Sequence, residues 1–254
     1  MWFLFATNYF YYTFYKKLMM LSHEEIGIIV LSLKVALWSV VISLPFALGI
    51  AHLLARHEFP GKSLLDAIVH LPLVLPPVVV GYALLLLLGR RGPLGALLNE
   101  WFGIVIAFRW TGAAVACALM GLPLMVRAMR LSIEAIDPKL ELAAQTLGAG
   151  RIGVFLTVTL PLALPGIITG ILLSFARSLG EFGATITFVF SIPGETQTLP
   201  LAIYALTQVP GGDAAALRLC VLSVVLSLAA LLISEVLVRR ASRRVLGYDA
   251  VGRD

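Results

Sequence analysis

Long apolar runs alternate with short polar segments along the chain. A run of about 20 apolar residues is long enough to cross roughly 30 Å of hydrocarbon as a helix. Five runs meet this requirement, and they cover residues 26–54, 64–88, 104–126, 160–179 and 216–238. The pattern predicts an all-α polytopic membrane protein with about five transmembrane helices.

The second run contains Pro72, Pro76 and Pro77. Each proline removes a backbone N–H and tends to kink a helix, and broken helices at membrane depth are tolerated where protein or a cavity covers them. We therefore expect a bent helix that other helices cover. His70, beside Pro72, is either a hydrogen-bonded structural residue, which we favour, or a proton relay.

The composition supports a membrane protein, because 60% of residues are hydrophobic and 13% are charged. A net charge of +5 could indicate nucleic-acid binding, but the basic residues lie at the ends of the apolar runs, so a membrane surface explains them better. Cys117 and Cys220 lie inside apolar runs, and we expect neither a disulfide nor a metal site.

Basic residues in short flanking loops stay on the cytoplasmic side during insertion. One side of the five-span scheme collects eleven of them: Arg56, Lys62, Arg127, Arg130, Lys139, Arg151, Arg239, Arg240, Arg243, Arg244 and Arg253. The other side has six: Lys16, Lys17, Arg90, Arg91, Arg109 and Arg218. This asymmetry predicts a multi-pass membrane protein with its N-terminus outside and its C-terminus in the cytoplasm.

The scheme gives three regions. Residues 1–25 form an aromatic N-terminal extension that is interfacial or, if synthesis starts at Met19 or Met20, partly not expressed. Residues 26–240 form the transmembrane domain with a cytoplasmic loop at 127–159, and residues 241–254 form a basic cytoplasmic tail. The Pro- and Gly-rich stretch at 192–212 is expected to form an outer loop with short helical pieces; a sixth short crossing within 183–212 is the alternative.

The cytoplasmic loop contains the signals of a short helix. Asp137 can cap free amides, Pro138 suits the first helical position and Gly148 offers a stop. Four small or apolar residues fall on one face of this helix: Leu140, Ala143, Ala144 and Leu147. A helix this short is not stable alone, so it lies either on its own membrane domain or in a groove of a partner.

Residues 140–148, followed after nine residues by 158–161, resemble the coupling motif of ABC importer permeases, which reads Glu-Ala-Ala, three residues, Gly, nine residues, Ile, any residue, Leu-Pro. Two positions depart from it: Leu142 stands where Glu is usual, with Glu141 one residue earlier, and Val158 replaces Ile. The resemblance implies that this helix docks on a separate ATP-binding subunit. The residues it implicates are Leu140, Glu141, Ala143, Ala144, Leu147, Gly148, Leu160 and Pro161.

The fourth apolar run carries a stripe that changes from small to polar. Gly166, Gly170 and Ser174 are spaced for close helix packing, and polar residues continue the stripe. An ionisable residue near the membrane normally faces protein or water. We expect either a pore-lining stripe or a salt-bridged helix end joining Arg177 to Glu181. The pathway candidates are Ser174, Ser178, Glu181, Thr185 and Thr187.

A wider resemblance covers residues 70–82, 177–185, 192–196 and 208–212, which look like those of molybdate importer permeases; permeases for sulfate, thiosulfate or tungstate share much of it. It implies the type I ABC importer permease fold, a homodimer, two ATP-binding cassette subunits that hold the ATP and Mg, and a periplasmic substrate-binding protein. No cofactor or metal is expected in this chain. Arg90, Arg91 and Arg109, on the outer side, are either docking residues for the binding protein or scattered surface charge.

Two other classes of protein fit less well. An ion-coupled secondary transporter should show an internal repeat with paired broken helices and more intramembrane acids, and the sequence shows no such repeat. An intramembrane enzyme should show a nucleophile with its base or a paired-His metal motif, and neither is present. The chain also lacks the full phosphate-cradling motif Gly-x-x-x-x-Gly-Lys-Ser/Thr, because Arg56 stands where its first glycine would precede Gly61-Lys62-Ser63. We therefore expect a transport subunit powered by a separate ATPase.

Overall fold

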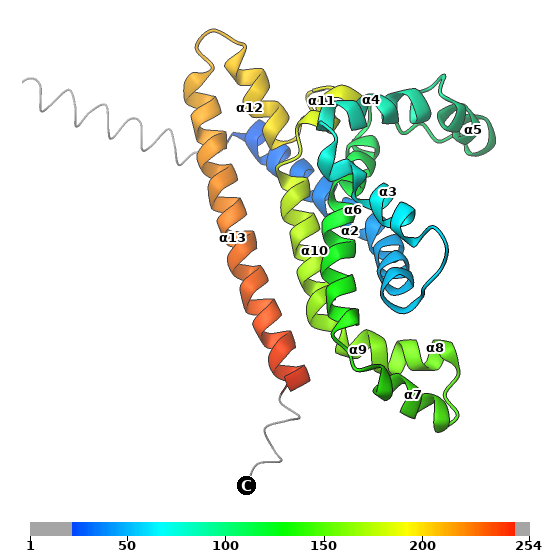
Figure 1. Ribbon diagram of the computed structural model, residues 1–254. Helices are drawn as coiled ribbons and strands as arrows, with labels where there is room; N and C mark the ends of the chain where they lie inside the picture. The colour runs from blue at the N-terminus through cyan, green and yellow to red at the C-terminus, as the bar shows by residue number, and fades with distance from the viewer. Residues whose placement is uncertain (1–21, 247–254) are drawn as a thin grey trace, which may run out of the picture.

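The computed structural model describes residues 22–246, and these residues form helices joined by short loops, with no strand among them (Figure 1). The elements in chain order are α2 His23–Arg56, α3 Lys62–Val74, α4 Pro77–Leu88, α5 Pro93–Phe102, α6 Trp110–Glu134, α7 Pro138–Thr146, α8 Arg151–Val154, a π-helical turn η1 Phe155–Thr159, α9 Leu160–Leu162, α10 Leu164–Leu179, α11 Gly183–Phe188, α12 Leu199–Thr207 and α13 Asp213–Leu246.

Three of these helices, α2, α6 and α13, are long and apolar enough to cross a membrane. Two further spans are bent pairs: α3 with α4, at 111°, and the segment Arg151–Leu162 with α10, at 70°. Counting each bent pair as one span gives up to five among the described residues. The predicted number of spans is confirmed on that count.

The bend between α3 and α4 falls at the prolines that the sequence singled out. Helix α3 ends at Val74, and Pro76 and Pro77 begin α4. His70 is hydrogen-bonded within α3, because its Nδ1 lies 2.9 Å from the carbonyl oxygen of Asp66 and 3.2 Å from the Asp66 carboxylate. These contacts fit the structural role favoured for His70.

The core is a three-helix contact between α2, α6 and α10, which lie side by side in Figure 1. Small residues bring the backbones together, since a Cβ on Gly170 would lie 3.0 Å from the carbonyl oxygen of Met125. Met125, Met129 and Ile133 of α6 are fully buried in the same cluster. The core thus combines close backbone approach with large flexible side chains, as is common in membrane bundles.

Several predicted boundaries were wrong. The third span was placed at 104–126, but α6 runs from Trp110 to Glu134, so the helix ends eight residues later than expected. The fourth was placed at 160–179, but α10 begins at Leu164 after a bend. Helix α13 continues to Leu246, into the predicted tail. The rest of that tail, 247–254, and residues 1–21 of the predicted extension lie outside the described residues.

The region of the suspected sixth crossing contains two short helices. Helix α11 has 6 residues and α12 has 9, so each is too short to span a bilayer alone. Helix α12 lies at the end of the molecule opposite α7, whereas α13 runs back and ends on the side of α7 (Figure 1). The short helical pieces expected in this region are present.

Candidate functional site

Helix α7 begins where the sequence predicted. The Asp137 carboxylate accepts a hydrogen bond from the backbone N–H of Lys139 at 2.9 Å, and Pro138 occupies the first helical position. After the helix, Gly148 has a φ of +91°, a left-handed conformation that glycine adopts without steric cost. The capping residue and the glycine therefore fix both ends of α7.

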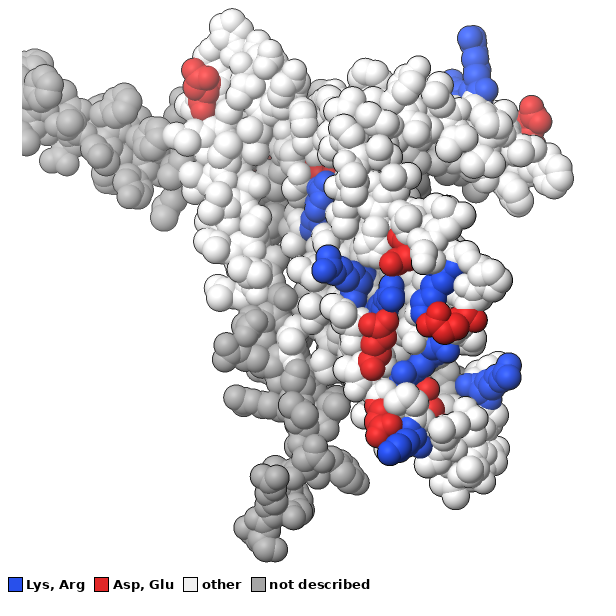
Figure 2. All heavy atoms as spheres, in the orientation of Figure 1, with Lys and Arg blue, Asp and Glu red and all other residues white. Residues whose placement is uncertain are grey.

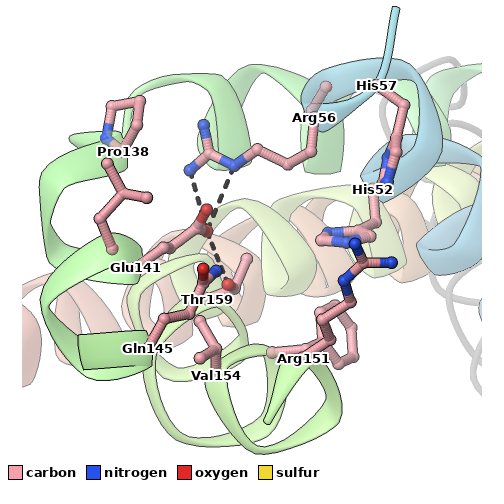
Figure 3. A pocket seen from close by; sticks show the side chains of 12 residues that line it. His52, Arg56, His57, Pro138, Glu141, Gln145, Arg151, Val154 and Thr159 are labelled. Atoms are coloured by element: carbon pink, nitrogen blue, oxygen red, sulfur yellow. Dashed lines mark hydrogen bonds and ion pairs between the residues drawn. The ribbon is translucent and has the colours of Figure 1, made fainter. Parts of the chain in front are cut away.

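Glu141 fastens α7 to the membrane domain. Its Oε1 accepts hydrogen bonds from Arg56 Nε at 3.2 Å and from the Thr159 hydroxyl at 2.7 Å, and Arg56 Nη2 lies 3.1 Å from the same oxygen (Figure 3). Arg56 also donates from Nη2 to the carbonyl of Ile136 at 3.2 Å. Because Arg56 is the last residue of α2, these contacts tie the first span directly to α7.

A pocket of about 460 Å³ lies beneath α7. Arg56, Arg151, His52 and His57 line it, and Glu141 is the single acid among its lining residues (Figure 3). Figure 2 shows charged side chains gathered over this end of the molecule. The cationic lining explains why the Glu141 carboxylate turns inward rather than toward solvent.

The apolar residues of α7 are exposed, although Leu142 also lines the pocket beneath the helix. Leu140 is 50% exposed, Leu142 57% and Leu147 89%, and Ile152 of α8 is 76% exposed. Of the small residues, Ala144 is half-buried and Ala143 is exposed. The predicted face therefore divides: Leu140, Ala143 and Leu147 are open to a partner, whereas Ala144 packs partly on the chain itself. Leu142 and Ile152 extend the open surface and were not predicted as site residues.

Leu160 and Pro161, the end of the motif, lie at the bend that leads into α10. The π-helical turn at Phe155–Thr159 closes with a hydrogen bond from the Leu160 N–H to the Phe155 carbonyl, and Pro161 follows in the first turn of α9. The two residues shape the connection between α8 and α10. Leu160 is half-buried and Pro161 is exposed.

The pathway candidates are mostly buried between helices. Ser178 Oγ lies 2.8 Å from Ser39 Oγ of α2, and Ser174 Oγ would lie 2.3 Å from a Cβ at Gly121. Thr185 is fully buried, and Thr187 is half-buried with its hydroxyl bonded to the Gly183 carbonyl at 2.9 Å. Of these hydroxyls, that of Ser178 joins α10 to α2, that of Thr187 bonds within α11, and that of Ser174 has no hydrogen-bond partner among the described residues. Their assignment to a pathway stays a prediction.

Glu181 is buried and ion-paired. Its Oε2 lies 2.6 Å from Arg177 Nη1, and its Oε1 accepts the backbone N–H of Ala184 at 2.8 Å. The pair that the sequence suggested is therefore present, and it also holds the start of α11. This arrangement matches the salt-bridged helix end that the sequence left as an alternative.

The three arginines that the sequence places on the outer side are exposed. Arg90 and Arg91 occupy the turn between α4 and α5, and Arg109 precedes α6. Within the described residues no group of His, Cys, Asp and Glu could hold a metal ion. Cys117 is buried and Cys220 is partly exposed, and both are free thiols.

Comparisons with known proteins agree with this architecture. Residues 27–243 match the family model of the binding-protein-dependent transport system inner membrane component. The chain is 60% identical over 226 residues, 89% of this chain and 99% of the relative, to the molybdenum transport system permease protein ModB of Escherichia coli (strain K12). It is 40% identical over 205 residues, 80% and 73%, to the sulfate transport system permease protein CysT of Salmonella typhimurium.

A solved bacterial ABC transporter involved in the import of the acidic polysaccharide alginate has a similar fold, with a TM-score of 0.70 and 20% identity over 90% of this chain and 83% of that chain. At this identity the likeness concerns the fold alone, which is that of type I ABC importer permeases. The family model matches nearly the whole length of the chain, and the fold and the exposed apolar helix between two spans agree with it. The chain therefore belongs to the binding-protein-dependent transport system inner membrane components.

Proposed function

We propose that this chain is the pore-forming permease subunit of an ATP-driven importer of molybdate in a bacterial inner membrane. Identity of 60% to a molybdenum permease over 99% of that protein supports the substrate, against 40% for the sulfate permease over 73% of its length. Sulfate, thiosulfate or tungstate transport is the alternative that an uptake comparison separates.

The observation that carries the proposal is the outward apolar surface of α7 and α8, formed by Leu140, Leu142, Leu147 and Ile152. Such residues on a polar loop indicate a protein partner. The inward Glu141 contacts hold this surface in a fixed position, which preorganised recognition requires. In the proposed complex the surface enters a groove of the ATPase subunit, and Gly148 ends the inserted helix.

A homodimer follows from this arrangement, because two identical permeases present two such surfaces to two identical ATPases. Closure of the ATPases on ATP draws the two α7 helices together, and the Arg56–Glu141 contact passes the motion to α2. The membrane domain then opens outward to receive substrate from a binding protein docked near Arg90, Arg91 and Arg109, and hydrolysis returns it inward. Hydrolysis belongs to the partner, and this chain is a transport subunit.

The orientation supports the same proposal. Helix α7 and the end of α13 lie at one end of the molecule, and α5 and α12 lie at the other (Figure 1). Placing α7 in the cytoplasm puts the exposed Arg90, Arg91 and Arg109 outside, with the start of α2.

The test is copurification with the ATPase encoded beside this chain. We expect the ATPase to bind the wild type and to be lost with Leu147→Asp or Ala143→Glu, because each places charge on the open surface of α7. Val209→Asp, an equally apolar and 57% exposed site after α12, is the matched control and should retain the ATPase. Binding that survives both α7 variants would refute the docking role. Failure of the wild type to bind any ATPase would refute the importer itself.

A further inference from the structure

The positively charged side chain of Arg177 lies inside the membrane domain but is not fully buried. It lies on α10 beside Ser178, whose carbonyl oxygen is 3.7 Å from the Cys117 sulfur. Because α6 starts at Trp110, Arg177 lies about 10 Å below that end of the span. Its side chain is nevertheless 28% exposed. A charge at such a depth faces protein or water rather than lipid.

Glu181 orients Arg177 but leaves most of its donors open. The carboxylate is 1% exposed and takes one contact from Nη1, while its other oxygen is engaged by the Ala184 N–H. A guanidinium has five N–H donors. Among the described residues Arg177 has no second acceptor, and its side chain is partly exposed, so donors remain available for a ligand.

Two more arginines lie at the α7 end of α6. Arg127 is exposed and has no acid within ion-pair distance in the described part of the chain. Arg130 lies 2.7 Å from Glu134 and 3.2 Å from Asp66, next to a hollow of about 350 Å³ that Arg127 also lines. Arg127 is ten residues beyond Cys117, or about 15 Å along the helix. Figure 2 shows basic side chains following one another down this face.

This face is the one that α2 leaves uncovered. Helix α2 contacts α10 through Ser39 and Ser178, and it contacts α6 through Ser43 and Met125. The arginines lie away from these contacts, and their neighbours Leu173 and Leu131 are 45% and 60% exposed. The open face therefore carries spaced cations on an otherwise apolar wall.

We propose that Arg177 and Arg127 are successive contact points for a tetrahedral oxyanion, such as molybdate, on its way through the membrane domain. This inference rests on the proposed function. Guanidinium N–H groups match the oxygens of such a dianion and replace the water that it sheds. At Arg177 the neighbouring acid Glu181 keeps the contact weak enough for the anion to leave, as conduction requires.

The competing explanation is that Arg177 only neutralises Glu181. The double variant Arg177→Met/Glu181→Gln separates the two, because it removes the cation and the charge that would need neutralising. Arg218→Met/Glu25→Gln is the matched control, since Arg218 and Glu25 form a similar partly buried pair, at 2.9 Å, between α13 and α2. Each double variant is assembled with the ATPase and the binding protein in proteoliposomes, and ATP-driven molybdate uptake is measured.

We expect the Arg177→Met/Glu181→Gln complex to take up molybdate about tenfold more slowly, the effect of losing one charge-assisted hydrogen bond, and the control to stay within about twofold of wild type. Arg177→Lys should recover part of the rate. Uptake equal to that of the control would overturn the proposal.

A variant that fails to assemble is replaced by Arg127→Gln, which breaks no ion pair and should slow uptake several-fold; unchanged uptake there would also overturn the proposal. Retention of the ATPase is measured on every sample. Failure of the wild-type permease to bind the ATPase would count against the proposed function. Slow uptake by a variant in an intact complex supports the anion contacts at Arg177 and Arg127.

Discussion

Arg56, the last residue of α2, lies 3.1 Å from Glu141 in the middle of α7, although 85 positions separate them in the chain. Both side chains are about 15% exposed. The pair converts a short helix that could not hold its own shape into a fixed extension of the first span.

Replacing Glu141 should destabilise the loop and weaken coupling. Glu141→Ala removes a charge-assisted hydrogen bond from Arg56 and one from Thr159, at a cost of about 1.5–3 kcal/mol. Thermal unfolding of the purified complex measures the loss. The double variant Arg56→Met/Glu141→Leu should be more stable than the sum of the two single losses predicts, because no unpaired charge remains. Additive losses would show that the two residues are not coupled.

Gly148→Ala should strain the end of α7. Its φ of +91° costs a residue with a Cβ about 1–2 kcal/mol, and no atom lies within 4 Å of that Cβ, so the effect is purely conformational. We expect weaker retention of the ATPase and a smaller loss for Gly148→Asn, since Asn tolerates this conformation. Gly153→Ala, whose Cβ would make an ordinary 3.9 Å contact, is the control and should behave as wild type.

Gly81→Ala should separate α4 from α11. A Cβ at this position would lie 2.5 Å from the carbonyl oxygen of Ala184 and 2.9 Å from its Cα, and backbone atoms cannot rotate away. The expected cost is about 1–3 kcal/mol, measured as a lower unfolding temperature. Gly49→Ala, with open space around the added methyl group, should be neutral or slightly stabilising. Equal stability of the two variants would contradict the packing described here.

Ser174→Ala should leave molybdate uptake unchanged within about twofold and should not reduce stability. The Ser174 hydroxyl is fully buried and has no hydrogen-bond partner, so its removal relieves an unsatisfied polar group worth about 1 kcal/mol. Measuring molybdate uptake by Ser174→Ala tests whether this hydroxyl contacts the transported ion or only packs between helices. A strong loss of uptake with normal stability would instead place this hydroxyl on the pathway.

The ends of α7 could be predicted because Asp137, Pro138 and Gly148 act on their immediate neighbours. The ends of α6 could not. Residues 104–108 are apolar enough for a span, but they form a loop in which Phe108 has a φ of 61°. At the other end Arg130 and Glu134 look like a polar loop, yet their ion pair and the contact with Asp66 continue the helix. Hydropathy reflects how apolar a segment is, and it carries no information about such contacts between side chains.

The candidate site, too, could be predicted from the sequence only in part. The spacing of the motif located α7, but the inward role of Glu141 depends on Arg56 and Thr159, which only the folded chain brings together. The stripe of hydroxyls on α10 was visible in the sequence, whereas its burial against α2 and α6 follows from Ser39 and Gly121 on other helices.

The break between α3 and α4 has a consequence for biosynthesis. Pro76 and Pro77 donate no hydrogen bond to the preceding turn, so this segment enters the bilayer with unsatisfied carbonyls. The backbone that packs on α4 belongs to α11, at Gly183 and Ala184, roughly a hundred residues later. The break in the second span can therefore be covered by this backbone only after most of the chain, through Ala184, has been synthesised.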